Sequence, residues 1–286
     1  MPALGNALGL PFRKNGLGFV GALDAYASGL VAIYSVNNRL LTSYSGSLVK
    51  VRRSSDSAEA DIGALADGSL DVSALTTFIG GGSGFIRTLY DQSGNGRHQQ
   101  QSTAAAQPRI GVDGNGQYYL YAPGAGSLTT SMSVTGLSIA APEFTIWSVA
   151  GTSGYWFTPI CLRDNAAGKE RAVYNSGAHL VTILQDNATG AVPANIGVTA
   201  GPVYSVLMSA GASGCKMTNR LSTTTGTRNA SACNIEQIHL GRISGGAAWL
   251  QNAPFYLAGV WAVDQGPTAN FAALATLGTT LITAAQ

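Results

Sequence analysis

Short apolar runs, separated by clusters of turn-forming residues, follow one another along most of the chain. The runs at 144–149 (FTIWSV) and 203–208 (VYSVLM) are apolar at successive positions, which is typical of strands buried on both faces. Similar runs at 180–184, 235–242 and 255–263 are divided by Gly, Asn, Ser and Thr. This pattern predicts an all-β domain of short strands.

Two hairpins are expected from the same pattern. Apolar alternation at 40–44 and 48–53, around Ser45-Gly46-Ser47, predicts one of them. The segment 215–222 predicts the other, with its turn near Thr218-Asn219. The stretch 23–38 mixes helical and strand periods and favours neither.

Two short helices are also predicted. Asp71 is a suitable N-cap for a helix at 71–78, which Gly80-Gly81-Gly82 would end. Pro267 suits the first turn of a helix at 268–277.

Charged side chains gather in two places that could supply catalytic carboxylates. In both, the favoured interpretation is a solvated loop with ion pairs, because surface pairs of this kind are common and contribute little. The first group is Arg52, Arg53, Asp56, Glu59 and Asp61, and the second is Asp164 and Glu170 in LRDNAAGKER, with Arg163, Lys169 and Arg171.

The composition is poor in charge. Charged residues make up 10% of the 286 residues, against roughly 25% in average soluble domains, and there are 37 Gly. A net charge of +2 gives no electrostatic case for nucleic acid or an anionic membrane. No run reaches the roughly 18 apolar residues of a membrane span. A surface of Ser, Thr, Asn and Gly suits an extracellular or virion β-protein.

The cysteines and histidines do not indicate a disulfide framework or a metal site. Cys161, Cys215 and Cys233 allow at most one disulfide, with Cys215–Cys233 the most plausible pair and three small buried residues the simpler alternative. The three histidines do not combine with cysteine at metal-ligand spacing, so neither a metal nor a cofactor is expected.

The first 22 residues read as an apolar arm. They are rich in Ala-Leu-Gly and Gly-Leu-Gly, and Arg13 and Lys14 stand in the wrong order for a signal peptide. Exposed apolar side chains of this number are unfavourable in water, so we expect docking on a partner protein. A strand folded onto the domain itself is the alternative. The residues expected to dock are Leu4, Leu8, Leu10 and Phe12.

The most distinctive motif is the loop YDQSGNG, residues 90–96, which follows the apolar run 85–90. Asp, Ser and Asn bond to their own backbone in turns, and Gly adopts positive φ. We interpret the loop as structural, a tight connection whose side chains satisfy backbone groups. Its residues are Tyr90, Asp91, Gln92, Ser93, Gly94, Asn95 and Gly96.

A longer block contains this loop. SYSGSLVKVRRSSDSAEADIG, a short Asp-Val-Ser-Ala-Leu helix and FIRTLYDQSGNGRHQQQSTAAAQPRI follow in order over roughly residues 40–113. The block resembles the catalytic domain of the arabinofuranosidase B family, and it is similar to segments of bacteriophage and prophage virion proteins. The resemblance implies a concanavalin A-like antiparallel β-sandwich, or jelly roll, over 23–286, with 1–22 as the docking arm.

The same resemblance implies that the enzyme's catalytic groups are missing here. Retaining glycosidases use two carboxyl groups about 5 Å apart. The nucleophile position falls on Gln185 in LVTILQDN and the acid/base position on Gly245 in LGRISG. Only Cys161 matches the family's two adjacent cysteines. A slip of one residue in this match would place Asp186 at the nucleophile position. The sequence therefore favours a protein without hydrolase activity.

The functional expectation is a non-enzymatic bacteriophage virion structural protein. It would be a tail fibre or receptor-binding protein, a minor tail protein or a head decoration protein, made in the host cytoplasm and carried on the particle. Its partners would be other virion proteins, reached through the arm, and further copies of itself. The alternative is a glycoside hydrolase of arabinofuranosidase type with a rearranged active site. A secreted bacterial adhesion module is a third interpretation.

Binding of a host-surface glycan is an additional expectation. Sugar sites combine an aromatic face with planar polar groups, although aromatic residues are also the usual content of a core. The candidate residues are Tyr155, Trp156, Asp186, Asn187 and Trp249.

Overall fold

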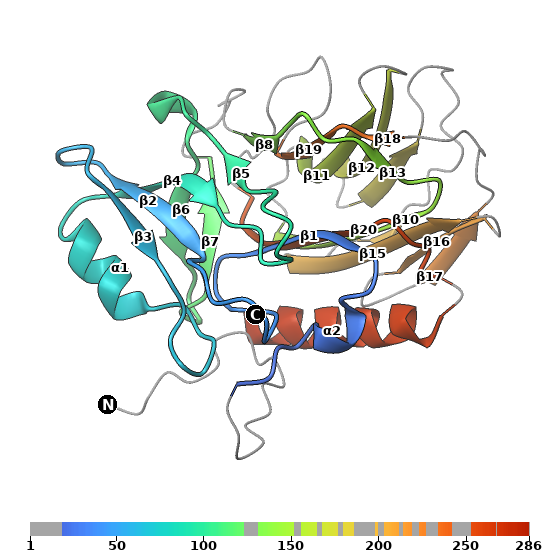
Figure 1. Cartoon of the computed structure of the whole chain (residues 1–286), viewed down its shortest axis with the longest axis horizontal. Coiled ribbons are helices and arrows are strands. Elements are labelled where there is room, and N and C mark those ends of the chain that lie inside the picture. The colour runs from blue at the N-terminus through green and yellow to red at the C-terminus, as the bar shows by residue number, and fades with distance from the viewer. Residues whose placement is uncertain are drawn as a thin grey trace.

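The protein is an antiparallel sandwich of two sheets, with a helix on the outer side of one of them (Figure 1). All strand pairings are antiparallel in the part of the chain that is described, which confirms the predicted all-β, jelly-roll-like fold. The computed structural model describes residues 19–122, 131–151, 156–164, 168–176, 180–185, 198–199, 203–211, 214–218, 223–226, 234–241, 253–266 and 268–285.

The first sheet has the order β1–β20–β10–β15–β16–β17. Its central strand β10 is buried at every position, because the core lies on one face and a helix on the other. The predicted hairpin at 215–222 corresponds to β16 and β17, whose turn lies outside the described residues. The strands are β1 Leu30–Ser35, β20 Phe255–Trp261, β10 Phe144–Gly151, β15 Val203–Gly211, β16 Gly214–Thr218 and β17 Thr223–Gly226.

The second sheet has the order β3–β2–β4–β5–β8–β19–β11–β12–β13–β14. It covers the other side of the core. Its strands are β2 Val49–Arg53, β3 Glu59–Ile62, β4 Gly84–Leu89, β5 Gln99–Gln100, β8 Met132–Val134, β11 Trp156–Asp164, β12 Lys169–Ser176, β13 Leu180–Gln185, β14 Val198–Thr199 and β19 Gln237–Leu240.

Strand β4 of the second sheet is linked to the first sheet through β6 and β7, which closes the sandwich on one side. At one end Thr88 pairs with Gln100 of β5, and at the other Phe85 pairs with Arg109 of β6. Strand β6 pairs with β7, which reaches β20 of the first sheet where Leu120 meets Phe255. The remaining strands are β6 Arg109–Val112, β7 Tyr118–Tyr121, and the pair β9 Ile139–Ala140 and β18 Asn234–Ile235.

The main core lies between the sheets. Aliphatic side chains such as Val51, Ile86, Ile146, Leu162 and Val260 fill it, each essentially inaccessible to solvent. A second apolar layer lies outside the first sheet and contains Trp147, Leu207, Trp261, Phe271 and Leu274.

Helix α2, Ala269–Ala285, covers that second layer along the first sheet (Figure 1). It approaches β15 so closely that a Cβ atom on Gly278 would lie 1.9 Å from the Ser205 Oγ. The helix predicted at 268–277 is thus present and extends further. Helix α1, Val72–Ile79, has the predicted caps, with the Asp71 Oδ1 accepting from the Ala74 N–H at 2.9 Å and Gly80 at φ 60°. Two short 3-10 helices are η1, Asp24–Tyr26, and η2, Ala104–Ala106.

The predicted strand at 40–44 is wrong. Leu40 uses its backbone groups elsewhere, with its N–H donating to the Gln92 Oε1 at 2.7 Å and its carbonyl accepting from Leu23 at 3.0 Å. The Thr42 N–H likewise donates to the Asp24 Oδ1 and the Tyr44 N–H to the Leu41 carbonyl, so these groups do not bond to a hairpin partner. Strand β2 pairs instead with β3, where Arg52 lies opposite Glu59.

The N-terminal segment enters the description at Phe19, on the surface of the domain. The Phe19 ring lies 3.8 Å from the Arg39 guanidinium carbon, and the Gly21 N–H donates to the Thr42 Oγ1 at 2.8 Å. The predicted docking residues, Leu4, Leu8, Leu10 and Phe12, lie outside the described residues, so docking of residues 1–22 on a partner stays a prediction.

Candidate functional site

The YDQSGNG loop is held by its own side chains. The buried Asp91 carboxylate accepts from the Ser93 N–H at 2.9 Å, the Ser93 hydroxyl at 2.8 Å and the Arg97 N–H at 3.0 Å. Gly94 and Gly96 adopt φ of 86° and 70°, which side chains with a Cβ rarely allow. A single carboxylate thus organises the whole turn.

The same loop covers the free edge of β1. Strand β1 pairs with β20 on one side, and loop residues bond its backbone on the other. The Ile33 N–H donates to the Asp91 Oδ1 at 3.0 Å, and the Ile33 carbonyl accepts from the Gln92 N–H at 2.9 Å. The Val31 carbonyl accepts from the Asn95 amide at 3.0 Å and from the Arg97 guanidinium at 2.7 Å. An edge that would otherwise be open to another strand is therefore closed.

An outer row of residues runs across the second sheet on the face away from the core. Register pairs join it step by step from β3 to β12. Chain neighbours of these residues, including Met132, Leu162 and Ile238, belong to the core, so the row faces outward. In order across the sheet, the outer row is Asp61, Lys50, Thr88, Gln100, Ser133, His239, Cys161 and Ala172.

The two ends of the outer row differ in exposure. The side chains of Lys50 and Asp61 are 32% and 46% exposed, whereas Cys161 is fully buried and His239 is 7% exposed. His239 shares a hydrogen bond of 2.8 Å between its Nε2 and the Gln237 Oε1. The resemblance assigned Cys161 to a sugar pocket, and the structure places it beside His239 at the buried end of the row.

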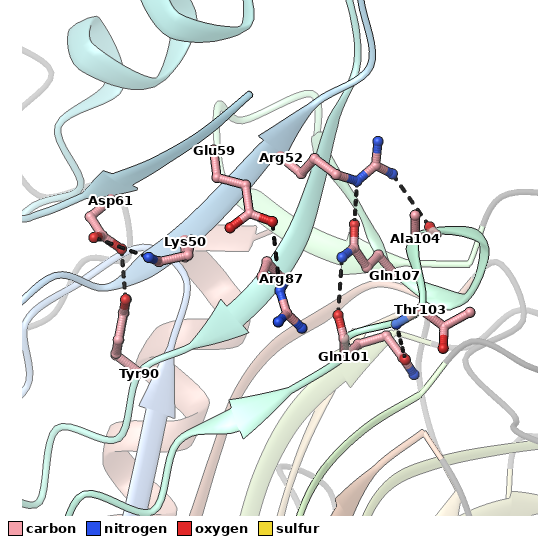
Figure 2. A network of polar contacts seen from close by, with 10 residues as sticks. All are labelled: Lys50, Arg52, Glu59, Asp61, Arg87, Tyr90, Gln101, Thr103, Ala104 and Gln107. Atoms are coloured by element: carbon pink, nitrogen blue, oxygen red, sulfur yellow. Dashed lines mark hydrogen bonds and ion pairs between the residues drawn. The ribbon is translucent and has the colours of Figure 1, made fainter. Parts of the chain in front are cut away.

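Polar contacts neutralise most charges at the exposed end (Figure 2). Asp61 pairs with Lys50 at 3.5 Å and accepts from the Tyr90 hydroxyl at 2.6 Å, while Glu59 pairs with Arg87 at 3.6 Å. The remaining predicted carboxylate, Asp56, forms an ion pair with Arg53. Within the predicted group the ion pair Arg53–Asp56 is thus confirmed, whereas Asp61 and Glu59 pair with Lys50 and Arg87, which lie outside that group.

Arg52 behaves differently from the neighbouring charges. Its Nε donates to the neutral Gln107 Oε1 at 2.7 Å and its Nη2 to the Ala104 carbonyl at 3.3 Å (Figure 2). Gln107 in turn donates to the Gln101 carbonyl at 3.0 Å. The guanidinium is thus held in place without a carboxylate.

The solvated charged loop predicted around Asp164 and Glu170 is wrong. These residues belong to β11 and β12. In the register of these two strands, Asp164 lies opposite Lys169 and Arg163 lies opposite Glu170. Asp164 is 4% exposed and Glu170 is 1% exposed. The Asp164 Oδ2 accepts from the Asn234 N–H at 3.0 Å. Neighbouring strands on both sides of β11 bury charges that the local sequence suggested were solvated.

Arg171 is the largest polar residue in the core. It is 1% exposed, lies 4.4 Å from the Phe144 ring centroid and donates to the Ala141 carbonyl at 2.9 Å. Its charge stays on the core side of the sheet, opposite to Glu170, since successive residues of a strand face opposite ways.

Of the two positions matched to catalytic carboxylates, only Gln185 has a described backbone. Gln185 is the last residue of β13 and lies opposite Arg171 of β12. Arg171 in turn lies opposite Leu162 of β11, and Leu162 lies opposite Ile238 of β19. Leu184, one residue earlier, pairs with Ala172 of the outer row. Gly245 lies outside the described residues.

The glycan candidates are not brought together by described contacts. Trp156 begins β11, and only its backbone is described. The other four candidates lie outside the described residues, so the glycan site stays a prediction: Tyr155, Asp186, Asn187 and Trp249.

Tyrosines beside carboxylates have raised pKa values. Burial, followed by the nearby Asp91 and Asp61 charges, raises the pKa of Tyr44 to about 12. Burial and the hydrogen bond to Asp61 also raise the pKa of Tyr90. The His98 ring packs edge-on to Tyr90 with centroids 5.0 Å apart, and its Nδ1 accepts from the Asp91 N–H at 3.1 Å. These phenols therefore remain neutral donors at physiological pH.

Other expected chemistry has few candidates in the described part of the chain. Cys161 is buried there, and the Cys215–Cys233 pairing stays untested because Cys233 lies outside it. Among the described residues, no three His, Cys, Asp or Glu side chains gather as metal ligands. None of the described helices combines the length and the hydropathy needed to cross a membrane.

The sequence interpretation missed the outer row and the strands β6, β7, β11 and β12. The alternation of Arg109-Ile110-Gly111-Val112 with buried Ile110, and of Tyr118–Tyr121 with buried Leu120, was a usable strand signal. The outer row had no local signal, because each residue in it comes from a different strand.

A family model described as alpha-L-arabinofuranosidase B, catalytic, matches residues 23–143. This range includes the YDQSGNG loop, β1 and the strands of the closed side. The match ends before β10, so most of the first sheet lies beyond it.

Curated relatives match over a similar stretch. A probable alpha-L-arabinofuranosidase B of Aspergillus fumigatus is 40% identical over 100 residues, which are 34% of this chain and 20% of that protein. An alpha-L-arabinofuranosidase of Hypocrea jecorina is 38% identical over 85 residues, 29% of this chain and 17% of that protein. The matched stretch thus spans about a fifth of these relatives.

Solved structures extend the likeness of fold to nearly the whole chain. A glutamate-to-glutamine variant of a GH54 α-L-arabinofuranosidase, soaked with 4-nitrophenyl α-L-arabinofuranoside, has a TM-score of 0.70 and 19% identity. It covers 93% of this chain and 66% of its own. An arabinofuranosidase complexed with arabinofuranosyl-α-1,2-xylobiose has a TM-score of 0.67, 20% identity and coverages of 93% and 65%. The chain therefore has the sandwich fold of these arabinofuranosidases, and its residues 23–143 match the arabinofuranosidase B catalytic family.

Proposed function

We propose that this protein is a glycoside hydrolase of arabinofuranosidase type with a rearranged active site. The observation that carries the proposal is the arabinofuranosidase B family match over residues 23–143, within a fold shared over 93% of the chain. A sugar would bind on the outer face of the second sheet, towards its buried end. Cys161 marks that region, because it corresponds to the sugar-pocket cysteines of the resembled family.

The rearrangement concerns the two carboxyl groups that glycoside hydrolysis requires. Gln185 and Gly245 occupy the matched positions, and neither can supply a carboxylate. Two other groups are available. Asp186 follows Gln185 directly in the sequence. Glu170 lies on the outer face of β12, diagonal to Cys161, at the roughly 7–8 Å typical of such neighbours.

The test is release of 4-nitrophenolate from 4-nitrophenyl α-L-arabinofuranoside, with three variants compared. We expect Asp186→Asn and Glu170→Gln each to lower kcat at least about 100-fold, as loss of an acid/base or nucleophilic group does. Asp56→Asn is the matched control and should leave kcat unchanged, since Asp56 bonds only to Arg53 and to the Ala58 N–H in an exposed turn. Thermal unfolding of each variant separates lost chemistry from lost folding. Absence of release by the unaltered protein would refute the hydrolase.

A second proposal follows from Gln185 and Gly245 themselves. Two neutral residues at carboxylate positions are consistent with a glycan-binding protein that does not hydrolyse its ligand, and an apolar arm suits attachment to a virion. In this proposal, deletion of residues 1–21 leaves the sandwich folded and prevents incorporation into phage particles. Particle imaging and copy number per virion measure this. Incorporation of the truncated chain at normal copy number would contradict it.

A further inference from the structure

A row of alternating arginine and aromatic residues crosses the closed side of the sandwich. Register pairs join Arg52 of β2 to Phe85 of β4, Phe85 to Arg109 of β6, and Arg109 to Tyr121 of β7. We call these four residues the Arg–aromatic row. Adjacent strands lie about 4.8 Å apart, so the two arginines stand on strands about 10 Å apart with one aromatic ring between them.

The Arg–aromatic row faces away from the core. The chain neighbours of its members, Val51, Ile86, Ile110 and Leu120, are all buried in the main core. Because side chains alternate along a strand, the row projects from the opposite face. All four of its side chains are half-buried, which leaves part of each accessible to a ligand.

The row is ordered before any ligand binds. The Arg52 guanidinium carbon lies 4.9 Å from the Phe85 ring centroid, and Gln107 and Ala104 hold its Nε and Nη2. The Nη1 takes no part in these bonds and keeps its donors. Tyr121 packs against the Tyr119 ring with centroids 5.4 Å apart. Preordered groups lose less entropy when a ligand binds.

Arg109 is the second cation of the Arg–aromatic row. Its guanidinium forms no hydrogen bond or ion pair with the described residues, although the residue is half-buried between Phe85 and Tyr121, with the Tyr119 hydroxyl within the range of its charge. Nearby charges are balanced, since Lys50 pairs with Asp61 and Arg87 with Glu59. Arg52 and Arg109 are therefore the cations of this surface without a carboxylate partner among the described residues.

We propose that the Arg–aromatic row binds an acidic oligosaccharide, a sugar chain that carries carboxylate groups such as those of uronic acids. A guanidinium binds a carboxylate in bidentate geometry. The Phe85 and Tyr121 rings offer apolar surfaces to the C–H faces of sugar rings, and the Tyr121 hydroxyl offers a donor. A nucleic acid would need a longer series of cations along its phosphates than the two arginines of this row.

The experiment is affinity gel electrophoresis of the full chain through gels containing polygalacturonate, with gels containing neutral dextran as reference. We expect polygalacturonate alone to retard the unaltered protein. Arg109→Gln and Tyr121→Ala should each raise the apparent Kd at least about fivefold. Lys216→Gln is the matched control, because it removes one positive charge on β16, at the far end of the first sheet from the row (Figure 1). Circular dichroism and thermal unfolding confirm that each variant is folded.

Three results would overturn the proposal. They are equal mobility of the unaltered protein in both gels, equal loss of retardation in Lys216→Gln and Arg109→Gln, and displacement of polygalacturonate by single-stranded DNA at lower concentration than by galacturonate oligomers. The second would indicate a net-charge effect and the third a nucleic-acid ligand. The measurement requires no hydrolysis, so its outcome is independent of the proposed enzyme activity.

Discussion

The Asp91 carboxylate accepts a hydrogen bond of 3.0 Å from the Ile33 backbone N–H, 58 positions earlier in the chain. The bond joins the centre of the YDQSGNG loop to the outer edge of β1. Ser93 and Arg97 donate to the same carboxylate, so one side chain both shapes the loop and fixes it to the first sheet. This explains why a loop dense in Asp, Ser, Asn and Gly can be structural.

Removal of the Asp91 carboxylate should therefore destabilise the whole domain. Asp91→Ala leaves the buried Ile33 N–H and the partly buried donors of Ser93 and Arg97 without this acceptor, and an unsatisfied buried donor costs about 1–3 kcal/mol. We expect the free energy of unfolding, measured by urea titration, to fall by about 3 kcal/mol or more. Asp91→Asn keeps one acceptor oxygen and should lose less. The exposed Asp56→Ala is the control and should leave the midpoint unchanged; an equal shift in both would contradict the argument.

Gly278 should resist substitution although it lies inside a helix. Alanine is the better helix former at an exposed position. Here its Cβ would lie 1.9 Å from the Ser205 Oγ and 3.1 Å from the Trp147 Nε1, so α2 or β15 must move. Overpacking of this kind costs about 1–3 kcal/mol. We expect a lower Tm for Gly278→Ala in calorimetry. Thr276→Ala, on the exposed side of the same helix, should keep or slightly raise the Tm.

Stability should decline at alkaline pH through Tyr44. Its pKa is raised to about 12, whereas the unfolded chain has the ordinary value of about 10. Between these values the unfolded chain loses the proton and the folded chain keeps it, so the contribution present below pH 10 is lost as the pH rises to about 12. Urea unfolding across this range should show a shallower decline for Tyr44→Phe. An unchanged slope, or an ordinary pKa in a spectrophotometric phenolate titration, would contradict this.

Two truncations should separate the docked part of the N-terminus from the rest. Phe19 packs on Arg39, and Gly21 bonds to Thr42 and Asp24. Deletion of residues 1–22 removes these contacts and should lower the free energy of unfolding by about 1–2 kcal/mol, mainly through lost apolar burial. Deletion of residues 1–18 keeps them, and we expect a smaller change. The measurement is the difference in the free energy of unfolding between the two truncated proteins, obtained from urea titrations. The prediction would be contradicted if deletion of residues 1–18 already caused the whole loss of free energy of unfolding and deletion of residues 1–22 caused no further loss.

The elements that depend on local pattern could be predicted from the sequence. β10 is apolar at successive positions, and its burial between the core and α2 needs no knowledge of distant residues. Helix α1 has its cap and its terminating glycine within ten positions of the chain, Asp71 to Gly80. The loop could be interpreted as self-bonded because Asp and Ser act on nearby backbone.

Features that depend on neighbouring strands could not be predicted. Arg163, Asp164 and Glu170 resemble solvated charges until β19 and β12 are placed on either side of β11. The outer row and the Arg–aromatic row each draw one residue from each strand, so neither has a pattern along the chain. The strand expected at 40–44 does not form, because the Leu40 N–H donates to the side chain of Gln92, fifty-two positions later in the chain.

The pairing of β1 with β20 can form during biosynthesis only after nearly the whole chain has been made. Leu30 meets Trp261, and at ~5–20 residues added per second the ribosome needs on the order of 10–50 s to travel between them. The YDQSGNG loop emerges early and can cover one edge of β1, while the other edge waits for nearly the last strand. During that interval the nascent chain carries an apolar strand with open hydrogen-bonding groups, which is a template for intermolecular association. Abundant chaperone should therefore raise the soluble yield.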